Sequence, residues 1–361
     1  MSDEAISAED LAALRDSVRD LLARSGGSEA VRAAIASDRR VDGGLWQRLA
    51  GDIGVAALAV PEDLGGVGAG WGALAAVVEE VGATLAPVPL FSSAVLATGA
   101  LLVAARHNGD GAAGLVESLA GGERTATLVV ADESSWETPG VKADGGLLTG
   151  TAHYVTDAEA ATDLVVLAGQ SSTSHVTLHV VAADAPGVTI IPVATMDPTR
   201  PLSQVAFEEV SAQAVPAPDD LLPRIRDLAW ALLAVEQVGA AGAALRMTVE
   251  YAKERKQFGR AIGSFQALKH RMADMYADVE TARSIAYAAV DAVGTSEGAE
   301  FAAAAHVYCS EAFNRVVAEA IQLHGGIGIT WEHDIQLYFK RAHSAAQFFG
   351  QPADVVAAAA L

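Results

Sequence analysis

The middle of this chain has a different sequence texture from its two ends, and that order restricts the folds it can adopt. Between residues 125 and 210, six short segments rich in Val and Thr are broken by Gly, Asp and Pro: "TATLVVA", "LLTGTAHYV", "TDLVVLAG", "HVTLHVVAAD", "GVTIIPVA" and "QVAFEEV". This pattern is typical of strands. On either side, apolar residues recur at the three- and four-residue spacing of helices. A parallel α/β fold would alternate the two patterns, so the sequence disfavours a Rossmann domain.

We therefore expect an α+β fold with three domains. An N-terminal helical domain covers residues 1–122, a central β-domain covers 123–222, and a C-terminal helical domain covers 223–361. The proline-rich segment "PAPDDLLP" marks the second boundary. In the first domain, Ser7 is the expected N-cap of a helix that starts in "SAEDLAALRDSV".

The C-terminal third contains three long helical segments, near residues 227–256, 264–294 and 297–323. The segments "FGRAIGSFQ" and "GGIG" interrupt this pattern with glycines. We expect the first helix to present one apolar face. The residues expected on that face are Leu228, Leu232, Val235, Val238, Leu245, Val249 and Ala252.

Composition and charge exclude several classes of function. The chain has 361 residues and a formal net charge of -21, which disfavours nucleic acid or an anionic membrane as the main partner. Cys309 is the only cysteine, so an intrachain disulfide is impossible and a buried core role is the simpler interpretation. The acidic N-terminus lacks the features of a signal peptide, and no uninterrupted apolar run reaches about 18 residues. We expect a cytoplasmic protein with no metal site.

A basic cluster stands out in this acidic chain. The segment "ERKQFGRAIGSFQALKHR" contains Arg255, Lys256, Arg260 and Arg271 around a glycine-containing loop that leads into a helix. Arginine beside a helix N-terminus is a good site for a diphosphate, because guanidinium and unpaired amides both bind anionic oxygens. A solvated basic hairpin is the plainer alternative.

Several separated segments resemble the acyl-CoA dehydrogenase family of flavoenzymes. They are "LWQRLAGDIGVAALAVPEDLGGVGAG", "EEVGATLAPVP", "GTAHYVTDAEAATDLVVLA", "ERKQFGRAIGSFQ" and "IQLHGGIGI", and they occur in the family's order over nearly the whole chain. The resemblance implies a helical N-terminal domain, a central β-barrel or sandwich, and a C-terminal four-helix bundle through which subunits associate. It also implies an FAD cofactor bound between subunits.

The resemblance assigns cofactor residues by position. On the ADP side these are Arg255, Phe258, Gln266, Gln322, Gly325 and Gly326. On the flavin side, Tyr154 and Thr156 of "YVTDA" would lie against the isoalloxazine ring, and Asp157 replaces the family's usual Asn. The family's "TEPxAGSD" loop is replaced by "VVADESSWETPGVKADGG", so the flavin side departs from the pattern.

The family's catalytic base is also missing. Counting forward from "QLHGGIG", the glutamate position falls on Phe349, and the alternative position used by a minority of members falls on Ala229. Neither side chain can accept a proton. Asp227 and Glu236 are the nearest carboxylates on that helix but project in other directions, so Glu236 is only a weak candidate.

These departures lead to a first hypothesis and two alternatives. The chain would be the non-catalytic partner in an α2β2 acyl-CoA dehydrogenase, donating FAD contacts while a paralogous subunit supplies the glutamate. Its substrate would be an acyl-CoA, such as a steroid side-chain thioester, and its electron acceptor an electron-transfer flavoprotein. Alternatively, it is a homomeric enzyme with a relocated base at Glu236, Glu332 or Asp334. A non-redox binding or structural protein on the same fold is the third reading.

Overall fold

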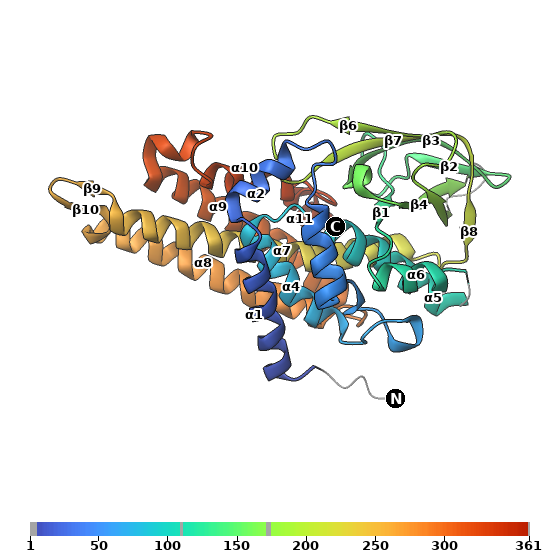
Figure 1. Cartoon of the computed structure of the whole chain (residues 1–361), viewed down its shortest axis with the longest axis horizontal. Helices are drawn as coiled ribbons and strands as arrows, with labels where there is room; N and C mark the ends of the chain where they lie inside the picture. Colours follow the sequence, from blue (N-terminus) through green and yellow to red (C-terminus); the bar gives the residue numbers. More distant parts are fainter. Residues whose placement is uncertain (1–5, 109–110, 171–174, 360–361) are drawn as a thin grey trace. The chain divides into compact units, whose positions relative to one another are not determined.

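The computed structural model describes residues 6–108, 111–170 and 175–359. Helices come first, a sheet follows, and helices complete the chain, which confirms the expected fold class (Figure 1). The chain forms two compact units, one of Met1–Val77 with Pro87–Ala229 and one of Val78–Ala86 with Trp230–Leu361. The three domain boundaries expected from the sequence remain a prediction.

The first helix begins where the sequence predicted. The Ser7 hydroxyl accepts a hydrogen bond from the Asp10 amide at 3.1 Å, so Ser7 is the N-cap of the first helix. The helical segments of this part are α1 (Ala8–Arg24), α2 (Gly27–Ile35), α3 (Gly43–Gln47), η1 (Arg48–Ile53), η2 (Val55–Ala57), η3 (Glu62–Leu64), α4 (Gly70–Thr84), η4 (Leu90–Ala97), α5 (Thr98–Asn108) and α6 (Ala113–Ala120).

The central part of the chain forms one eight-stranded sheet with the order β6-β7-β3-β2-β4-β5-β8, and β1 also pairs with β4. Strand β4 pairs in parallel with β1 and β2 and antiparallel with β5. The strands are β1 (Ala126–Val129), β2 (Val141–Asp144), β3 (Leu147–Thr156), β4 (Asp163–Gln170), β5 (Val176–Ala182), β6 (Val188–Val193), β7 (Leu202–Ser211) and β8 (Gln213–Val215). A short helix, η5 (Ala158–Ala160), follows β3.

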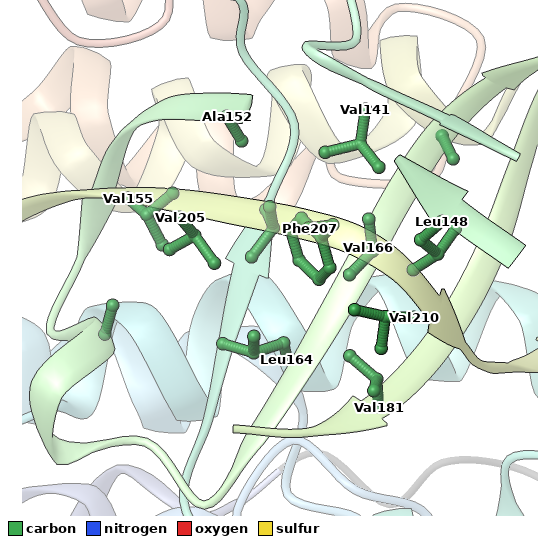
Figure 2. Packing of buried hydrophobic residues seen from close by; sticks show 13 residues of the cluster. Val141, Leu148, Ala152, Val155, Leu164, Val166, Val181, Val205, Phe207 and Val210 are labelled. Carbon is green, nitrogen blue, oxygen red and sulfur yellow. The ribbon is translucent and has the colours of Figure 1, made fainter. Parts of the chain in front are cut away.

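The sheet encloses an apolar core made mainly of β-branched residues (Figure 2). Phe207 is the largest side chain of this cluster and is 2% exposed, with Leu164, Val166 and Val205 around it. Val and Ile side chains are stiff at χ1 and pack well on a pleated surface, so the composition that predicted strands also fills the core.

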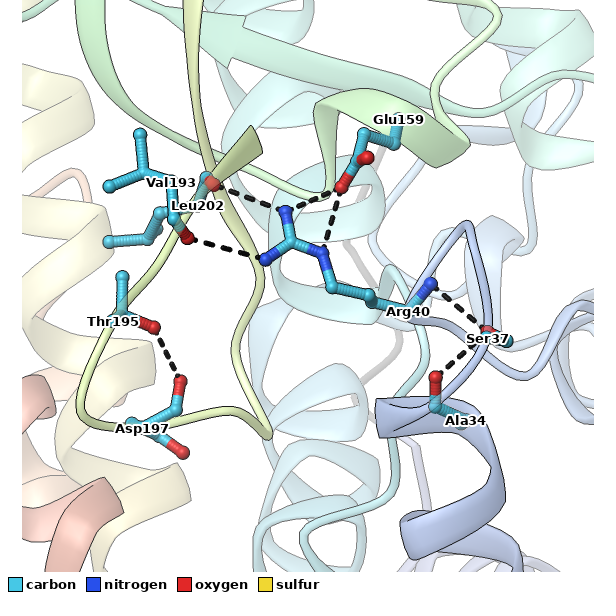
Figure 3. Close-up of polar contacts among 8 residues, drawn as sticks. All are labelled: Ala34, Ser37, Arg40, Glu159, Val193, Thr195, Asp197 and Leu202. Carbon is cyan, nitrogen blue, oxygen red and sulfur yellow. Dashed lines mark hydrogen bonds and ion pairs between the residues drawn. The ribbon is translucent and has the colours of Figure 1, made fainter. Parts of the chain in front are cut away.

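Arg40 joins the helical N-terminal segment to the sheet within the same compact unit (Figure 3). Its guanidinium donates to the Glu159 carboxylate, with Nε at 2.9 Å, and to the carbonyl oxygens of Val193 and Leu202 at 3.4 and 3.2 Å. Both side chains of the ion pair are largely shielded from solvent, and the two carbonyl contacts satisfy two further N–H donors of the guanidinium.

The second unit is helical. Its elements are the main part of α7 (Leu221–Glu254), β9 (Lys256–Gln257), β10 (Arg260–Ala261), η6 (Ile262–Ser264), α8 (Gln266–Asp291), α9 (Gly298–His324), η7 (Gly325–Ile329), α10 (Ile335–Ala345) and α11 (Pro352–Ala359). Figure 1 shows α7 and α8 side by side, with the β9–β10 hairpin at their shared end. Cys309 is buried, as expected, and burial raises the pKa of its thiol to about 12.

The residues expected on the apolar face of α7 are buried, apart from the half-buried Val249, but burial is not limited to that face. Every residue from Leu228 to Leu245 is buried, so this stretch is enclosed on all sides. Two helical stretches, Leu90–His107 and α7, are long and apolar enough to cross a membrane, but 78% and 100% of their apolar windows are buried inside the protein. Burial of this extent is typical of core helices in soluble proteins.

Glycines allow α7 to touch the end of α4 within the second unit. A Cβ atom at Gly239 would overlap the carbonyl oxygen of Glu79, and one at Gly82 would overlap the carbonyl oxygen of Glu236. The two backbones are therefore in direct contact at this crossing. Glu79 is itself buried and paired with Arg283, and its carboxylate accepts a hydrogen bond from the Tyr287 hydroxyl at 2.7 Å.

Replacing Gly239 with alanine tests this crossing. The added methyl group would have to displace helix backbone, so Gly239→Ala should lower the free energy of unfolding by about 1–3 kcal/mol. Gly242→Ala is the matched control, because its Cβ would meet only side-chain atoms, at 3.4 Å or more. It should be neutral or stabilising by up to about 1 kcal/mol through helix propensity. Urea unfolding of both variants measures the difference, and equal effects would contradict the packing account.

Candidate functional site

The basic segment "ERKQFGRAIGSFQ", the first of two signature segments of the candidate site, forms a hairpin after α7. Lys256–Gln257 pairs with Arg260–Ala261, and the connecting residues Phe258 and Gly259 both have positive φ, 51° and 76°. Two residues of this conformation make the turn favoured by tight hairpins. The Phe258 side chain lies at the tip and is 93% exposed, the highest value among the large apolar side chains that the structure describes.

The start of α8 adds an open anion-binding end beside this hairpin. The N-cap residue Phe265 provides no side-chain hydrogen bond, and Gln266 is exposed at the first helical position. The Arg260 guanidinium lies 4.0 Å above the Phe265 ring, which fixes its charge near this helix end. Arg255 is exposed and makes no ion pair with any residue that the structure describes. Positive charge and unpaired amides together suit a diphosphate.

The second signature segment, "IQLHGGIGI", contains a turn made of two glycines. Helix α9 ends at His324, and Gly325 follows with φ 63° and ψ -144°, a conformation that favours glycine. Gly325 and Gly326 are exposed, and a Cβ on either would have no atom within 4 Å. Gln322 is exposed one turn earlier. A ligand could therefore approach this backbone closely.

A hydrogen bond brings the two signature segments together. The Tyr251 hydroxyl, on the last turns of α7, donates to the His324 carbonyl at 3.2 Å, directly before the glycine turn. The Arg255 amide donates to the Tyr251 carbonyl at 2.9 Å, one helical turn further on. The residues predicted for the ADP side thus lie at one end of the second unit, and their chemistry fits the diphosphate part of FAD. The contact itself remains a prediction.

The flavin-side residues are held by their own loop. Tyr154 has φ 57°, its hydroxyl donates to the Glu133 carbonyl at 2.9 Å, and its ring lies 5.4 Å from that of Trp136. Thr156 is only 4% exposed, which leaves little of it to face a ring. Asp157, with φ 52°, accepts a hydrogen bond from the Ser92 hydroxyl at 2.6 Å. The loop that replaces the family motif therefore packs against Tyr154, and the predicted flavin contacts of Tyr154 and Thr156 remain untested.

The expected base position is an apolar turn clamped by two buried side chains. The Phe349 carbonyl accepts a hydrogen bond from Trp230 Nε1 at 3.1 Å, and the Gly350 carbonyl accepts one from His306 Nε2 at 2.8 Å. The Trp230 and His306 rings are stacked, with centroids 5.3 Å apart. Phe349 is buried with φ 59°, and Ala229 is fully buried. Neither position presents a carboxylate.

The alternative carboxylates are paired with arginines or lie at least partly exposed to solvent. Glu236 is 5% exposed and forms a 2.9 Å ion pair with Arg341, which is also buried. This pairing accounts for the buried carboxylate of Glu236 without a catalytic role. Asp227 pairs with Arg226 at 2.9 Å, Glu332 is exposed, and Asp334 is half-buried.

Sequence reasoning missed the residues that shape these turns. Trp230 and His306 clamp the base position, while Tyr251 and His324 support the glycine turn. The His of "QLHGGIG" and the Tyr four residues before Arg255 were visible signals, but their meeting depends on contacts between distant helices. His306 carried no local signal at all.

The buried His306 predicts acid-sensitive stability. Burial lowers the pKa of His306, so the folded protein keeps the ring neutral while the unfolded chain, with an ordinary pKa of about 6.5, takes up a proton. The contribution of neutral His306 to the stability of the folded protein is therefore complete above the pKa of the unfolded chain. It is lost as pH falls through the lower pKa of the folded protein. His306→Gln keeps a donor for Gly350 but does not titrate. Its thermal unfolding should depend less on pH between 7.5 and 5 than that of the parent chain, and an unchanged slope would contradict this.

Comparison with known proteins places these features in a family. The acyl-CoA dehydrogenase N-terminal domain matches residues 8–108, and the acyl-CoA dehydrogenase C-terminal domain matches residues 229–353. The chain is 43% identical to the acyl-CoA dehydrogenase IpdE2 of Mycobacterium tuberculosis over 343 residues, which cover 95% of this chain and 94% of that protein.

Two solved structures have the same fold over their whole length. A variant of the Tcur3481–Tcur3483 steroid ACAD is 32% identical with a TM-score of 0.86, covering 98% of this chain and 99% of that one. The ChsE4–ChsE5 complex of Mycobacterium tuberculosis is 29% identical with a TM-score of 0.87, covering 100% and 98%. The chain therefore belongs to the acyl-CoA dehydrogenase family, whose members are FAD-dependent oxidoreductases.

Proposed function

We propose that this chain is the non-catalytic subunit of a heteromeric acyl-CoA dehydrogenase, assembled as an α2β2 tetramer with a paralogous subunit. One combination of features carries the proposal: the position of the family's base is apolar, while the residues predicted to contact the ADP part of FAD are exposed. We call these residues, Arg255, Phe258, Gln266, Gln322, Gly325 and Gly326, the cofactor surface. Phe349 and Ala229 cannot accept a proton, whereas Arg255, Phe258 and the Gly325–Gly326 turn remain open at one end of the second unit. The partner would supply the catalytic glutamate.

In this arrangement each residue of the cofactor surface has a physical role. Arg255 would bind the diphosphate through its guanidinium, and Phe258 would pack against the adenosine part, which accounts for its exposure. Gln266 and Gln322 would donate hydrogen bonds, and the Gly325–Gly326 backbone would approach the ligand closely. When bound, FAD supplies the acceptor for the hydride removed from the β-carbon of the acyl thioester.

The relatives support the finer points of this proposal. One neighbour is a complex of two named chains and another is a steroid ACAD, so we extend to this chain a paralogous partner and a steroid-derived acyl-CoA substrate. An electron-transfer flavoprotein would reoxidise the flavin, and the assembly would act in the cytoplasm. The three domains would keep the boundaries 1–122, 123–222 and 223–361, with the last providing the oligomer interface.

Reconstitution tests the proposal. The purified single chain should show no acyl-CoA oxidation, and turnover should appear on co-expression with a paralogue that carries the base. In that complex, Arg255→Gln should raise the Kd for FAD by about 10–100-fold, because a charge-assisted contact to phosphate is lost. Arg315→Gln is the control, since Arg315 is paired with Asp278 on the helices. Flavin fluorescence titration compares the two, and turnover by the single chain would contradict the proposal.

Introducing a glutamate at the family's base position distinguishes this proposal from the homomeric alternative. Phe349→Glu in the single chain should give no detectable turnover, because the family's flavin-side motif is still replaced by the loop that packs against Tyr154. Dye reduction with acyl-CoA measures activity, and circular dichroism checks that the variant folds. In the homomeric alternative, Glu236→Gln would instead abolish an activity that the parent chain possesses by itself.

A further inference from the structure

Arg260, in the β9–β10 hairpin, is a cation outside the cofactor surface. It is exposed, and it forms no ion pair with any residue that the structure describes. Arg255 is in the same state, and the exposed carboxylate of Glu254 pairs with neither arginine. The chain has 45 acidic and 24 basic residues, yet none of the described carboxylates neutralises these two guanidiniums. Both charges are therefore available to an anionic ligand.

Backbone pairing places the two arginines on the same face of the hairpin. Arg260 pairs with Gln257. The Ile262 amide donates to the Arg255 carbonyl at 2.8 Å, which extends the pairing by one position beyond the strands. Since side chains alternate between the two faces of a paired strand, Arg255 shares a face with Arg260, and Lys256 lies on the opposite face.

This register makes Arg255 and Arg260 diagonal neighbours. Such residues are about 7–8 Å apart in an antiparallel pair, a distance that long side chains can bridge. Each guanidinium can therefore bind one phosphate of the same diphosphate, whereas a monophosphate can occupy only one of them fully. Without a ligand the two like charges repel each other, so a bound diphosphate would also remove an unfavourable interaction.

Phe265 holds the guanidinium of Arg260 in place. The centre of that guanidinium lies 4.0 Å from the centroid of the Phe265 ring. The Phe258 ring meets Phe265 edge to face, with the centroids 6.1 Å apart. A guanidinium that stacks on an aromatic face keeps the N–H donors of its edge for hydrogen bonds. The contact therefore limits the freedom of a long side chain before the ligand binds.

We propose that Arg260 is a second diphosphate-binding residue, which acts with Arg255 on the two phosphates of FAD, and that Phe265 is its positioning residue. The inference rests on the proposed function and adds a preference of the hairpin for two linked phosphates over one. Lys256 carries the same charge in the same hairpin but lies on the face that this contact does not use.

Competition with ADP and AMP tests the role of Arg260. The co-expressed complex, stripped of flavin, is titrated with FAD alone and in the presence of each nucleotide, with flavin fluorescence as the signal. The parent complex should bind ADP about tenfold more tightly than AMP, because only ADP can engage both guanidiniums. Arg260→Gln should raise the Kd for FAD about 10–100-fold and lower this preference to about threefold or less.

Lys256→Gln is the matched control for charge. It removes one positive charge from the same hairpin, but an exposed charge on the opposite face is screened by solvent and salt. The Kd for FAD and the preference for ADP over AMP should therefore stay within about twofold of the parent values. Circular dichroism of each variant checks that the complex is folded.

Phe265→Leu and Phe265→Tyr test the positioning role. The leucine variant loses the contact between cation and ring, so the Kd for FAD should rise about 2–5-fold. The tyrosine variant keeps an aromatic face and should restore the parent value. Neither change removes a helix cap, because the Phe265 side chain makes no capping hydrogen bond to α8. Equal Kd values for the two variants would contradict the positioning role.

The outcomes separate this inference from the proposed function. Equal effects of Arg260→Gln and Lys256→Gln would mean that only the total charge of the hairpin matters, and would overturn the inference alone. An unchanged preference for ADP over AMP in Arg260→Gln would do the same. A parent complex that binds no FAD would overturn it together with the proposed function.

Discussion

The enclosure of α7 is the constraint on which the second unit depends. The polar side chains of a helix that is buried on all sides cannot be hydrated, so each of them needs a hydrogen-bond or ion-pair partner inside the protein. Glu236 meets this requirement through Arg341, and the glycine at 239 allows the backbone of α4 to approach. Removing one partner of such a buried pair would leave an uncompensated charge inside the protein and lower its stability.

The same helix connects the two places that decide the function. Near its start in the second unit, Trp230 holds the Phe349 carbonyl where a catalytic base would be expected. Near its end, Tyr251 holds the backbone before the glycine turn, and Arg255 begins the exposed hairpin. The end at Trp230 packs against a buried apolar turn, while the end at Arg255 is exposed and accessible to a ligand. That asymmetry supports a subunit that binds cofactor without abstracting a proton.

Much of the fold could be predicted because its signals are local. The six strand segments read from Val and Thr content correspond to β1 and β3–β7, and the helix that starts after Ser7 is capped as expected. Strands β2 and β8 were missed because they have only four and three residues and a partly exposed, polar pattern. The burial of α7 beyond its expected apolar face was not predicted, because segments distant in sequence cover its other sides, which periodicity cannot reveal.

The candidate site was predictable only in part. The resemblance located the hairpin and the glycine turn, and the structure brings them to one end of the second unit. The clamp on Phe349 was not predictable, since His306 lies more than forty residues away in sequence and carries no motif. Nor could the sequence indicate that Trp136 would pack beside Tyr154, because that contact joins a loop to a strand end.

The number of FAD molecules per purified complex tests most directly the claim that this chain binds FAD only together with a partner subunit. If this chain provides an ADP-side surface but no flavin-side one, each FAD must be completed by the partner, and an α2β2 assembly can hold two. Native mass spectrometry together with flavin absorbance should therefore give two FAD per four chains and none on the isolated chain. Four FAD per tetramer, or one FAD on each isolated chain, would contradict the account.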